Sequence, residues 1–331
     1  MQHKTVAFSK KSSNLFFHIL TKCNLSCSHC YINREQHGDM TLPFDTIRDW
    51  LGLFAPKAPK TNLVLLGGEP TLHPDLYLVV REARRLGFRS ITIDTNGYLF
   101  HNILDKITPD DLDFLSFSLD GATPDTNDKI RGKGSYDAVL SGIHRAKSKG
   151  FSCAMIYTVS DKNIHELARM PALVKGLGID RFFIQVIGMR GESSTSSDTL
   201  QVSKDIWLGT IPTVAEKIAA QGIVVAYPKV FLSDGEPFQC AGNVSDNYFV
   251  FPNGRVYKCP ICEDFPLHSH EIINNRLMAL PPINETDLFK LTIPEGCVMN
   301  KMIQPGNLTY DTDGKPCHRI ACCLLKQELT P

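Results

Sequence analysis

The chain has 331 residues, 43% of them hydrophobic, which is enough for one large α/β domain and a smaller second one. Lysine plus arginine and aspartate plus glutamate both number 35, so the formal net charge is zero. Because no basic excess exists, we exclude a nucleic-acid-binding protein that works by neutralising phosphates. The N-terminus lacks the apolar core of a signal peptide, and no run of about 18 apolar residues occurs. We therefore expect no membrane span and a cytoplasmic location.

The chain alternates strand-like and helix-like segments. Apolar runs predict strands at residues 14–20, 62–66, 90–94, 113–119, 151–159 and 181–187. Periodic segments between them predict helices at 41–54, 73–86, 135–149 and 163–177. Such alternation favours parallel strands joined by right-handed crossovers. We therefore predict a partial (β/α)6 barrel of the TIM type.

After the sixth predicted strand, residues 188–200 form a small, polar stretch that we expect to be a mobile loop. A helix at 203–221 and a short strand at 223–227 are predicted next. The composition then shifts toward Pro, Gly and Cys. We predict two domains: a barrel over residues 1–227 and a small, loop-rich, cysteine-rich domain over residues 228–331.

The cysteines are distributed unevenly. Of 11 cysteines, three lie near the start, Cys153 stands alone in a predicted strand, and seven lie between Cys240 and Cys323. In a reducing compartment, cysteine clusters indicate metal binding rather than disulfides. The distribution therefore predicts two separate metal regions, with Cys153 as a core residue.

The first cluster, TKCNLSCSHCY at residues 21–31, places Cys23, Cys27 and Cys30 at the spacing C-x3-C-x2-C. Iron–sulfur clusters and zinc both select thiolate ligands. A structural zinc site closes with four ligands, whereas three thiolates on a 4Fe–4S cluster leave one iron open for a cosubstrate. The spacing indicates the open cluster. The alternative is a zinc knuckle that borrows His29 or His37 as its fourth ligand.

This motif, followed by the aromatic Tyr31, resembles the signature of the radical S-adenosylmethionine (radical SAM) superfamily. The resemblance covers about residues 14–187. It implies that Cys23, Cys27 and Cys30 hold a 4Fe–4S cluster whose open iron chelates S-adenosylmethionine. It also implies reductive cleavage of the sulfonium to a 5′-deoxyadenosyl radical, which abstracts hydrogen from a substrate. Tyr31 would pack near the adenine.

Two further segments follow predicted strands in the family's order. Gly67-Gly68-Glu69-Pro70 resembles its GGEP motif, whose glycines let backbone carbonyls approach the amino group of S-adenosylmethionine. Thr95-Asn96-Gly97 resembles its TNG motif. Because functional residues of parallel barrels collect where strands end, we expect Gly67, Gly68, Glu69 and Asn96 at the cofactor site. The alternative for each is ordinary turn chemistry.

Ser118-Leu119-Asp120-Gly121 resembles the family's S-[IL]-D-G segment, and the resemblance gives Ser118 and Asp120 bonds to the ribose or the methionine end of the cosubstrate. Arg131, in a segment that resembles RG-x-G-[ST]-[FY], would pair with the carboxylate of S-adenosylmethionine. The alternatives are a turn for Asp120-Gly121 and a surface position for Arg131.

The C-terminal cysteines resemble the auxiliary-cluster domains called SPASM and twitch. Cys240 and Cys259 flank Gly254 at the spacing C-x13-G-x4-C, and Asn253-Gly254 predicts a hairpin turn between them. The later SPASM cysteine pattern is absent, so we expect one auxiliary 4Fe–4S cluster, completed by Cys317 and Cys322. Cys262 competes for this role, and the alternative metal is zinc, because Lys258-Cys-Pro-Ile-Cys262 resembles a zinc-ribbon knuckle.

Together these motifs predict a radical SAM oxidoreductase or maturase that modifies a peptide or protein by hydrogen abstraction. Synthesis of a small cofactor or porphyrin is the alternative, and a non-catalytic iron–sulfur or zinc protein is the alternative of another class. The resemblance implies a low-potential electron donor of the flavodoxin or ferredoxin type. About 13 residues precede the first predicted strand, so we expect leader-peptide recognition to need a separate protein.

Overall fold

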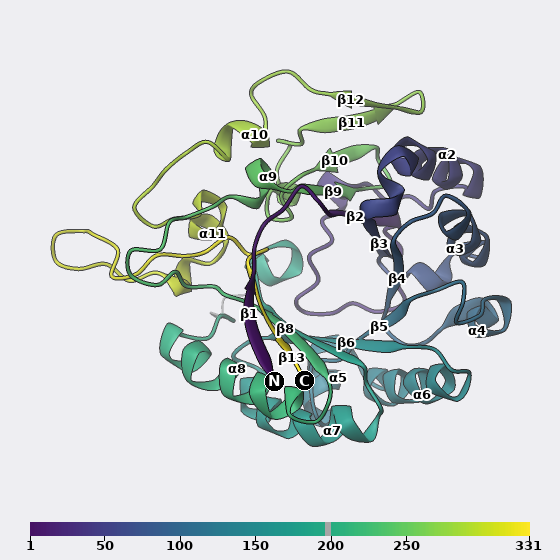
Figure 1. The fold of residues 1–331 in the computed structure, drawn as a ribbon, viewed down its shortest axis with the longest axis horizontal. Helices are drawn as coiled ribbons and strands as arrows, with labels where there is room; N and C mark the ends of the chain where they lie inside the picture. Colours follow the sequence, from purple (N-terminus) through teal and green to yellow (C-terminus); the bar gives the residue numbers. More distant parts are fainter. Residues whose placement is uncertain (196–199) are drawn as a thin grey trace.

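The computed structural model describes residues 1–195 and 200–331, and its centre is a curved parallel sheet (Figure 1). The six predicted strands are confirmed. They are β2 (Ser13–Leu20), β3 (Thr61–Gly67), β4 (Ser90–Thr95), β5 (Phe114–Ser118), β6 (Cys153–Val159) and β7 (Arg181–Val186). Each pairs in parallel with the next, and β8 (Val224–Pro228) continues the series beside β7. The sheet is thus the predicted partial barrel.

Helices cover the outside of this sheet (Figure 1). The longer ones are α2 (Phe44–Phe54), α3 (Leu76–Arg85), α5 (Pro124–Arg131), α6 (Ser135–Ser148), α7 (Met170–Gly176) and α8 (Lys204–Ala219). The short α-helices are α1 (Arg34–His37), α4 (Ile103–Lys106), α9 (Ala241–Val244), α10 (Glu285–Leu288) and α11 (Val298–Ile303). The 3-10 helices are η1 (Ala55–Lys60), η2 (Pro70–Leu72), η3 (Phe100–Asn102), η4 (Ile164–Arg169), η5 (Gly191–Thr195), η6 (Cys262–Asp264) and η7 (Pro305–Asn307). In α2, Ile47, Trp50, Leu51 and Phe54 recur at helical spacing and are buried. No helix of the described residues is long and apolar enough to cross a membrane.

The two faces of the parallel sheet differ in exposure. Side chains that face the helices, such as Leu63 and Ile93, are fully buried, whereas the alternate ones, such as Val64 and Thr92, remain partly accessible. The inner face of the barrel is therefore accessible to solvent.

At the amino ends of the strands, a polar ladder crosses the inner face. Ser90 Oγ donates to Asn62 Oδ1 at 3.0 Å, and Asn62 Nδ2 donates to Asn14 Oδ1 at 3.0 Å. Asn14 Nδ2 in turn donates to Asn247 Oδ1 at 2.8 Å. The ladder ties four neighbouring strands together at the end opposite the predicted site.

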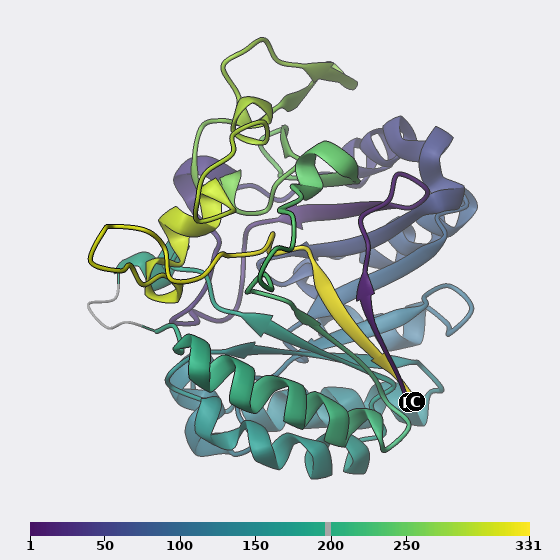
Figure 2. The same cartoon turned by 60° about the vertical axis from the view of Figure 1, so that its left-hand side comes forward.

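Later parts of the chain extend both edges of the sheet. Next to β2 lie β9 (Asp246–Val250), β10 (Arg255–Tyr257), β11 (His270–Ile273) and β12 (Arg276–Ala279). The hairpin predicted around Asn253-Gly254 is confirmed as β9–β10. At the other edge, β13 (Lys326–Thr330) runs antiparallel between β8 and β1 (Gln2–Val6), so the two ends of the chain lie side by side (Figures 1 and 2).

The structure qualifies three sequence-based expectations. In the predicted loop 188–200, residues 191–195 form η5, and residues 196–199 lie outside the described part. Strands β1, β11, β12 and β13 were not predicted. The division into domains at residue 227 stays a prediction, since β9 and β13 both join the barrel sheet.

Candidate functional site

The loop that carries Cys23, Cys27 and Cys30 leaves the carboxyl end of β2 and is held by the end of α5. The backbone N–H of Ser28 donates to the carbonyl of Ile130 at 2.9 Å, and the Cys27 thiol lies 3.8 Å from the carbonyl of Arg131. All three cysteines are free and partly accessible. The loop is thus fixed by backbone contacts while its thiols stay available.

Gly67 and Gly68 allow the end of β3 to pack directly on this loop. A Cβ atom at Gly67 would lie 2.2 Å from the carbonyl oxygen of Leu20, and one at Gly68 would lie 2.3 Å from that of Lys22. The space beside each glycine is therefore filled by backbone, and N–H groups of this segment donate to the same two carbonyls at 3.1 and 3.0 Å. Any larger residue here would displace the cysteine loop.

Glu69 and Asn96 join this cluster from β3 and β4. The Glu69 carboxylate is fully buried, and it accepts hydrogen bonds from the Asn96 N–H at 2.7 Å and the Thr95 hydroxyl at 2.8 Å. Asn96 Nδ2 donates to Asn24 Oδ1 at 2.8 Å and lies 3.8 Å from the Cys23 sulfur. The structure thus brings Glu69, Asn96 and Cys23 together.

Asp120 and Arg131 form a buried ion pair with His29. Arg131 Nε lies 2.6 Å from Asp120 Oδ2, His29 Nε2 lies 3.1 Å from the same oxygen, and the Thr158 N–H donates to Oδ1 at 2.7 Å. Burial alone would raise the pKa of Asp120, but Arg131 and His29 outweigh it and lower that pKa to about 2. Asp120 therefore uses its oxygens within the protein and orients Arg131 and His29.

The three thiols lie in a poorly solvated position. Burial raises the pKa of Cys23 and Cys30, and raises that of Cys27 to about 11, while the nearby Arg131 opposes the shift for Cys27 and Cys30. His29 Nδ1, inside the same motif, is buried with no hydrogen-bond partner. Three soft thiol ligands within one short loop, beside an unpartnered polar atom, fit a bound iron–sulfur cluster.

The side chains of Ser118 and Tyr31 lie in different surroundings. Ser118 ends β5 on the inner face of the barrel and is partly accessible. Tyr31 is also partly accessible, but its polar end is engaged: its hydroxyl bonds His18 Nε2 at 2.8 Å, and the Arg190 guanidinium lies 4.8 Å from its ring centre. The contacts of Tyr31 with His18 and Arg190 do not test whether its ring packs beside the adenine, so this role stays a prediction.

Arg190 links the first cysteine loop to the C-terminal one. Besides covering Tyr31, Arg190 donates to Glu263 Oε2 at 2.9 Å and to the carbonyl of Pro260. Gly191 and Glu192, the two residues after Arg190, lie along the first cysteine loop. The Glu192 N–H donates to the carbonyl of Cys30 at 2.8 Å. The sequence offered no signal for this link, because Arg190 lies in a stretch of small polar residues.

The histidines weighed as zinc ligands are engaged elsewhere. His37 Nδ1 accepts from the Asn33 N–H at 3.0 Å, and Nε2 bonds the carbonyl of Glu263 at 3.1 Å. His29 Nε2 is held by Asp120. Within residues 1–195 and 200–331, no group of three or more His, Cys, Asp or Glu side chains is arranged around a single metal ion.

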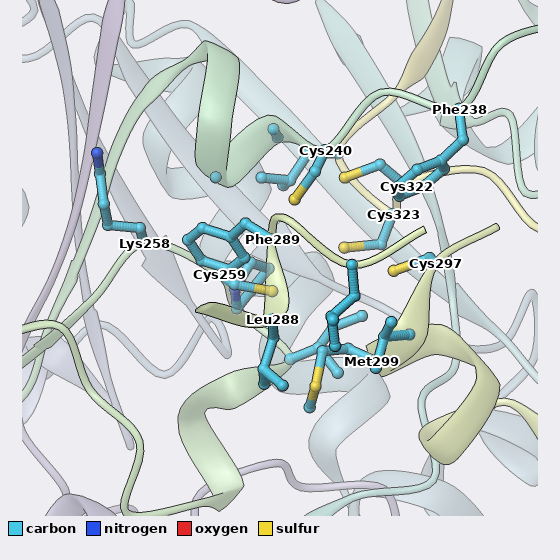
Figure 3. A pocket seen from close by; sticks show the side chains of 17 residues that line it. Phe238, Cys240, Lys258, Cys259, Leu288, Phe289, Cys297, Met299, Cys322 and Cys323 are labelled. Atoms are coloured by element: carbon cyan, nitrogen blue, oxygen red, sulfur yellow. The ribbon is translucent and has the colours of Figure 1, made fainter. Parts of the chain in front are cut away.

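Five C-terminal cysteines line one pocket, and their sulfur atoms point toward a common space (Figure 3). They are Cys240, Cys259, Cys297, Cys322 and Cys323. Apolar side chains such as Phe238, Phe289 and Met299 line the rest of the pocket. The structure thus brings together three of the predicted ligands, Cys240, Cys259 and Cys322. Cys317 is exposed and does not line the pocket.

Glu285 shapes the part of this pocket that carries Cys259. Its buried carboxylate accepts from the N–H groups of Lys258 and Cys259 at 2.6 and 3.0 Å, and from the Ser269 hydroxyl at 2.6 Å. Burial raises the pKa of Glu285 to about 7. Cys262 lies just behind, fully buried, with its thiol against that of Cys259.

The sequence is similar to a known protein family and to several characterised enzymes. Residues 18–174 match the model of the radical SAM superfamily. The chain is 30% identical over 193 residues to pre-heme d1 synthase of Dinoroseobacter shibae, covering 56% of this chain and 46% of that protein. It is 30% identical over 200 residues to Fe-coproporphyrin III synthase of Methanosarcina barkeri, covering 58% and 49%. The chain thus spans about half the length of these curated relatives.

Solved structures share the fold. Streptococcus suis SuiB bound to the precursor peptide SuiA matches with a TM-score of 0.65 and 16% identity, covering 85% of this chain and 65% of that one. Native anSMEcpe with bound AdoMet matches with a TM-score of 0.59 and 13% identity, covering 90% and 85%. Residues 18–174, which contain the cysteine loop and the motifs at the strand ends, therefore belong to the radical SAM superfamily.

Proposed function

We propose that the protein is a radical SAM enzyme in which Cys23, Cys27 and Cys30 hold a 4Fe–4S cluster beside bound S-adenosylmethionine. The superfamily that residues 18–174 match uses this cluster and this cosubstrate. When bound, the pair supplies a 5′-deoxyadenosyl radical that removes a hydrogen atom from a substrate. The electron comes from a low-potential donor of the flavodoxin or ferredoxin type.

One observation carries this proposal: three free thiols meet the ends of β3, β4 and β5 at the carboxyl edge of a parallel barrel. Asn96 lies beside Cys23, and Arg131 lies beside Cys27. The chain's own contribution is positioning. The glycines of the 67–70 segment clamp the loop, and the buried Asp120 carboxylate holds the cation of Arg131 next to the thiolates that a cluster requires.

We propose that the C-terminal pocket holds an auxiliary 4Fe–4S cluster on Cys240, Cys259, Cys297 and Cys322. Cys297 replaces Cys317 in this set, because Cys297 lines the pocket whereas Cys317 is exposed. The sulfur atoms approach from separate segments of chain, as a multi-iron cluster needs (Figure 3). Cys323 also faces the pocket and is the alternative to its neighbour Cys322.

For the substrate, we propose a peptide or protein that is oxidised or crosslinked. Likeness of fold to SuiB, whose structure was solved with the precursor peptide SuiA, supports it. A tetrapyrrole is the second candidate, because two sequence relatives are named pre-heme d1 synthase and Fe-coproporphyrin III synthase.

The test is an anaerobic reconstitution with iron and sulfide, followed by dithionite reduction and assay of 5′-deoxyadenosine. We expect product from the wild-type protein and none from the variant in which Cys23, Cys27 and Cys30 are all alanine. If the triple variant still releases 5′-deoxyadenosine, the proposed cluster site is wrong.

A further inference from the structure

We propose that Lys326 and Asp94 form a substrate-binding site on the inner face of the barrel, which takes a group presenting both a carboxylate and an N–H donor. This inference rests on the proposed function, because it names the chemistry of the substrate that the radical would meet.

Both side chains occupy inward positions on their strands. In β4, Ile91 and Ile93 face the helices and are fully buried, so Asp94 faces inward, where it remains partly accessible. In β13, Gln327 and Leu329 are buried, and Lys326 is partly accessible on the alternate face. The site therefore combines a central strand with a strand from the far end of the chain.

Small residues neighbour Asp94 across the sheet, and an aromatic ring neighbours Lys326. Asp94 is in register with Ser116 of β5, and Ser116 with Ala154 of β6. The Lys326 ammonium lies 4.4 Å from the ring centre of Phe183 on β7. A ligand here would meet an aromatic face as well as the two charges.

Neither group has an oppositely charged partner in an ion pair among the described residues, although the Ser116 side chain hydrogen-bonds the Asp94 carboxylate. Among the described residues, no ion pair within 4.0 Å involves Lys326 or Asp94, whereas Glu328, two positions along β13, pairs with Lys4 at 2.8 Å. Charges without a charged partner inside a protein are costly, and groups with shifted pKa values cluster at functional sites.

The two groups act on the same space. Four strands separate β4 from β13 in the sheet, yet the Lys326 ammonium opposes the effect of burial that raises the pKa of Asp94 to about 6. Burial likewise lowers the pKa of Lys326, and Cys323, Glu328 and Asp94 oppose that shift. The two charges therefore influence each other across the inner face of the barrel, although no ion pair joins them.

The location suits a substrate. Asp94 lies two residues before Asn96, which contacts the first cysteine loop, and Lys326 lies three residues after Cys323 of the second pocket. A group held by both would sit between the two cysteine sites. Its carboxylate would bind the Lys326 ammonium, and its N–H would donate to Asp94.

The experiment measures dissociation constants of two matched probe pairs with the reconstituted protein. One pair is dansyl-Gly-Glu-Gly-amide and dansyl-Gly-Gln-Gly-amide, and the other is coproporphyrin III and its tetraamide. Both acids carry carboxylates and N–H donors, so the pair that binds identifies the source of the carboxylate. We expect at least one acid to bind the wild-type protein about tenfold more tightly than its amide.

Variants then test which side chain makes the protein bind the acid probe more tightly than its amide. Lys326→Met should reduce the acid-to-amide preference to less than twofold, Lys326→Arg should restore it, and Asp94→Ala should weaken acid and amide alike. Lys290→Met removes an exposed lysine on the same protein and should keep the preference. Iron content and thermal midpoint verify that each variant is folded.

Equal binding of acid and amide to the wild-type protein, failure of all four probes to bind, or an unchanged preference in Lys326→Met would each overturn the inference. Its failure is distinguishable from failure of the proposed function. Absence of 5′-deoxyadenosine from the wild-type protein refutes the latter and leaves the binding result standing.

Discussion

Replacement of Asp120 by asparagine tests the buried network that orients the cysteine loop. The pKa of Asp120 falls from 3.8 to about 2 in the folded protein, which corresponds to about 2 to 3 kcal/mol of stabilisation at neutral pH. Asparagine removes this contribution by leaving the Arg131 guanidinium without its counter-charge, and breaking a buried ion pair in this way typically costs about 3 to 5 kcal/mol in all. We expect Asp120→Asn to lower the free energy of unfolding by about 2 to 5 kcal/mol.

The assay is thermal unfolding by circular dichroism of the iron-loaded proteins, in which we expect a midpoint roughly 3 to 7 °C lower. The double variant Asp120→Asn/Arg131→Met removes both charges, so it should lose less stability than the sum of the two single variants. Additive losses would refute the ion-pair reasoning.

The pH dependence gives a second check. Because the folded pKa of Asp120 lies below the unfolded value of 3.8, its contribution is complete above about pH 5 and is lost only as pH falls from there toward 2. The difference between wild type and Asp120→Asn should therefore be constant from pH 8 to pH 5. A difference that shrinks within this range would mean that Asp120 is not held as a charged partner.

Other substitutions probe the two cysteine sites. In a protein that lacks the first three cysteines, Cys297→Ala should lose most of the C-terminal iron and Cys317→Ala should keep about four irons per chain; the reverse result would restore Cys317 as a ligand. Gly68→Ala should abolish 5′-deoxyadenosine formation, because its Cβ would lie 2.3 Å from the carbonyl of Lys22; wild-type activity would show that the loop can move aside. Ser118→Ala removes a hydroxyl that makes no hydrogen bond to another described residue, and it should weaken S-adenosylmethionine binding about tenfold or less, with folding unchanged, as measured by equilibrium dialysis and thermal midpoint.

The barrel strands were predictable because each carries a short apolar run, and these runs alternate with segments of helical periodicity. The strands that close the sheet were not. β1 is exposed along its whole length, and β13 reads KQELT, with buried residues only at alternate positions. Such polar strands form because a partner edge is available, and this long-range pairing leaves little trace in local sequence.

The sequence motifs identified most residues of the candidate site, but they did not predict which of these residues contact one another. Spacing located Cys23, Cys27 and Cys30, and the structure places the predicted Glu69 and Asn96 beside them. Spacing could not tell which distant thiols return to the C-terminal hairpin, so Cys297, which lines the pocket, was not among the predicted ligands. The contact of Arg131 with Asp120 was missed too, since both were expected to bind the cosubstrate directly. Two opposite charges at one site satisfy each other first when no ligand separates them.

The contact made by Arg190 has a thermodynamic consequence. A single guanidinium joins the loop of Cys30 and Tyr31 to that of Pro260 and Glu263, so ordering of one loop lowers the cost of ordering the other. Linkage makes this effect reciprocal: if iron at the first loop favours iron at the second, the second favours the first by the same factor. If both loops hold the proposed clusters, such coupling would make partly loaded molecules less populated than independent binding predicts.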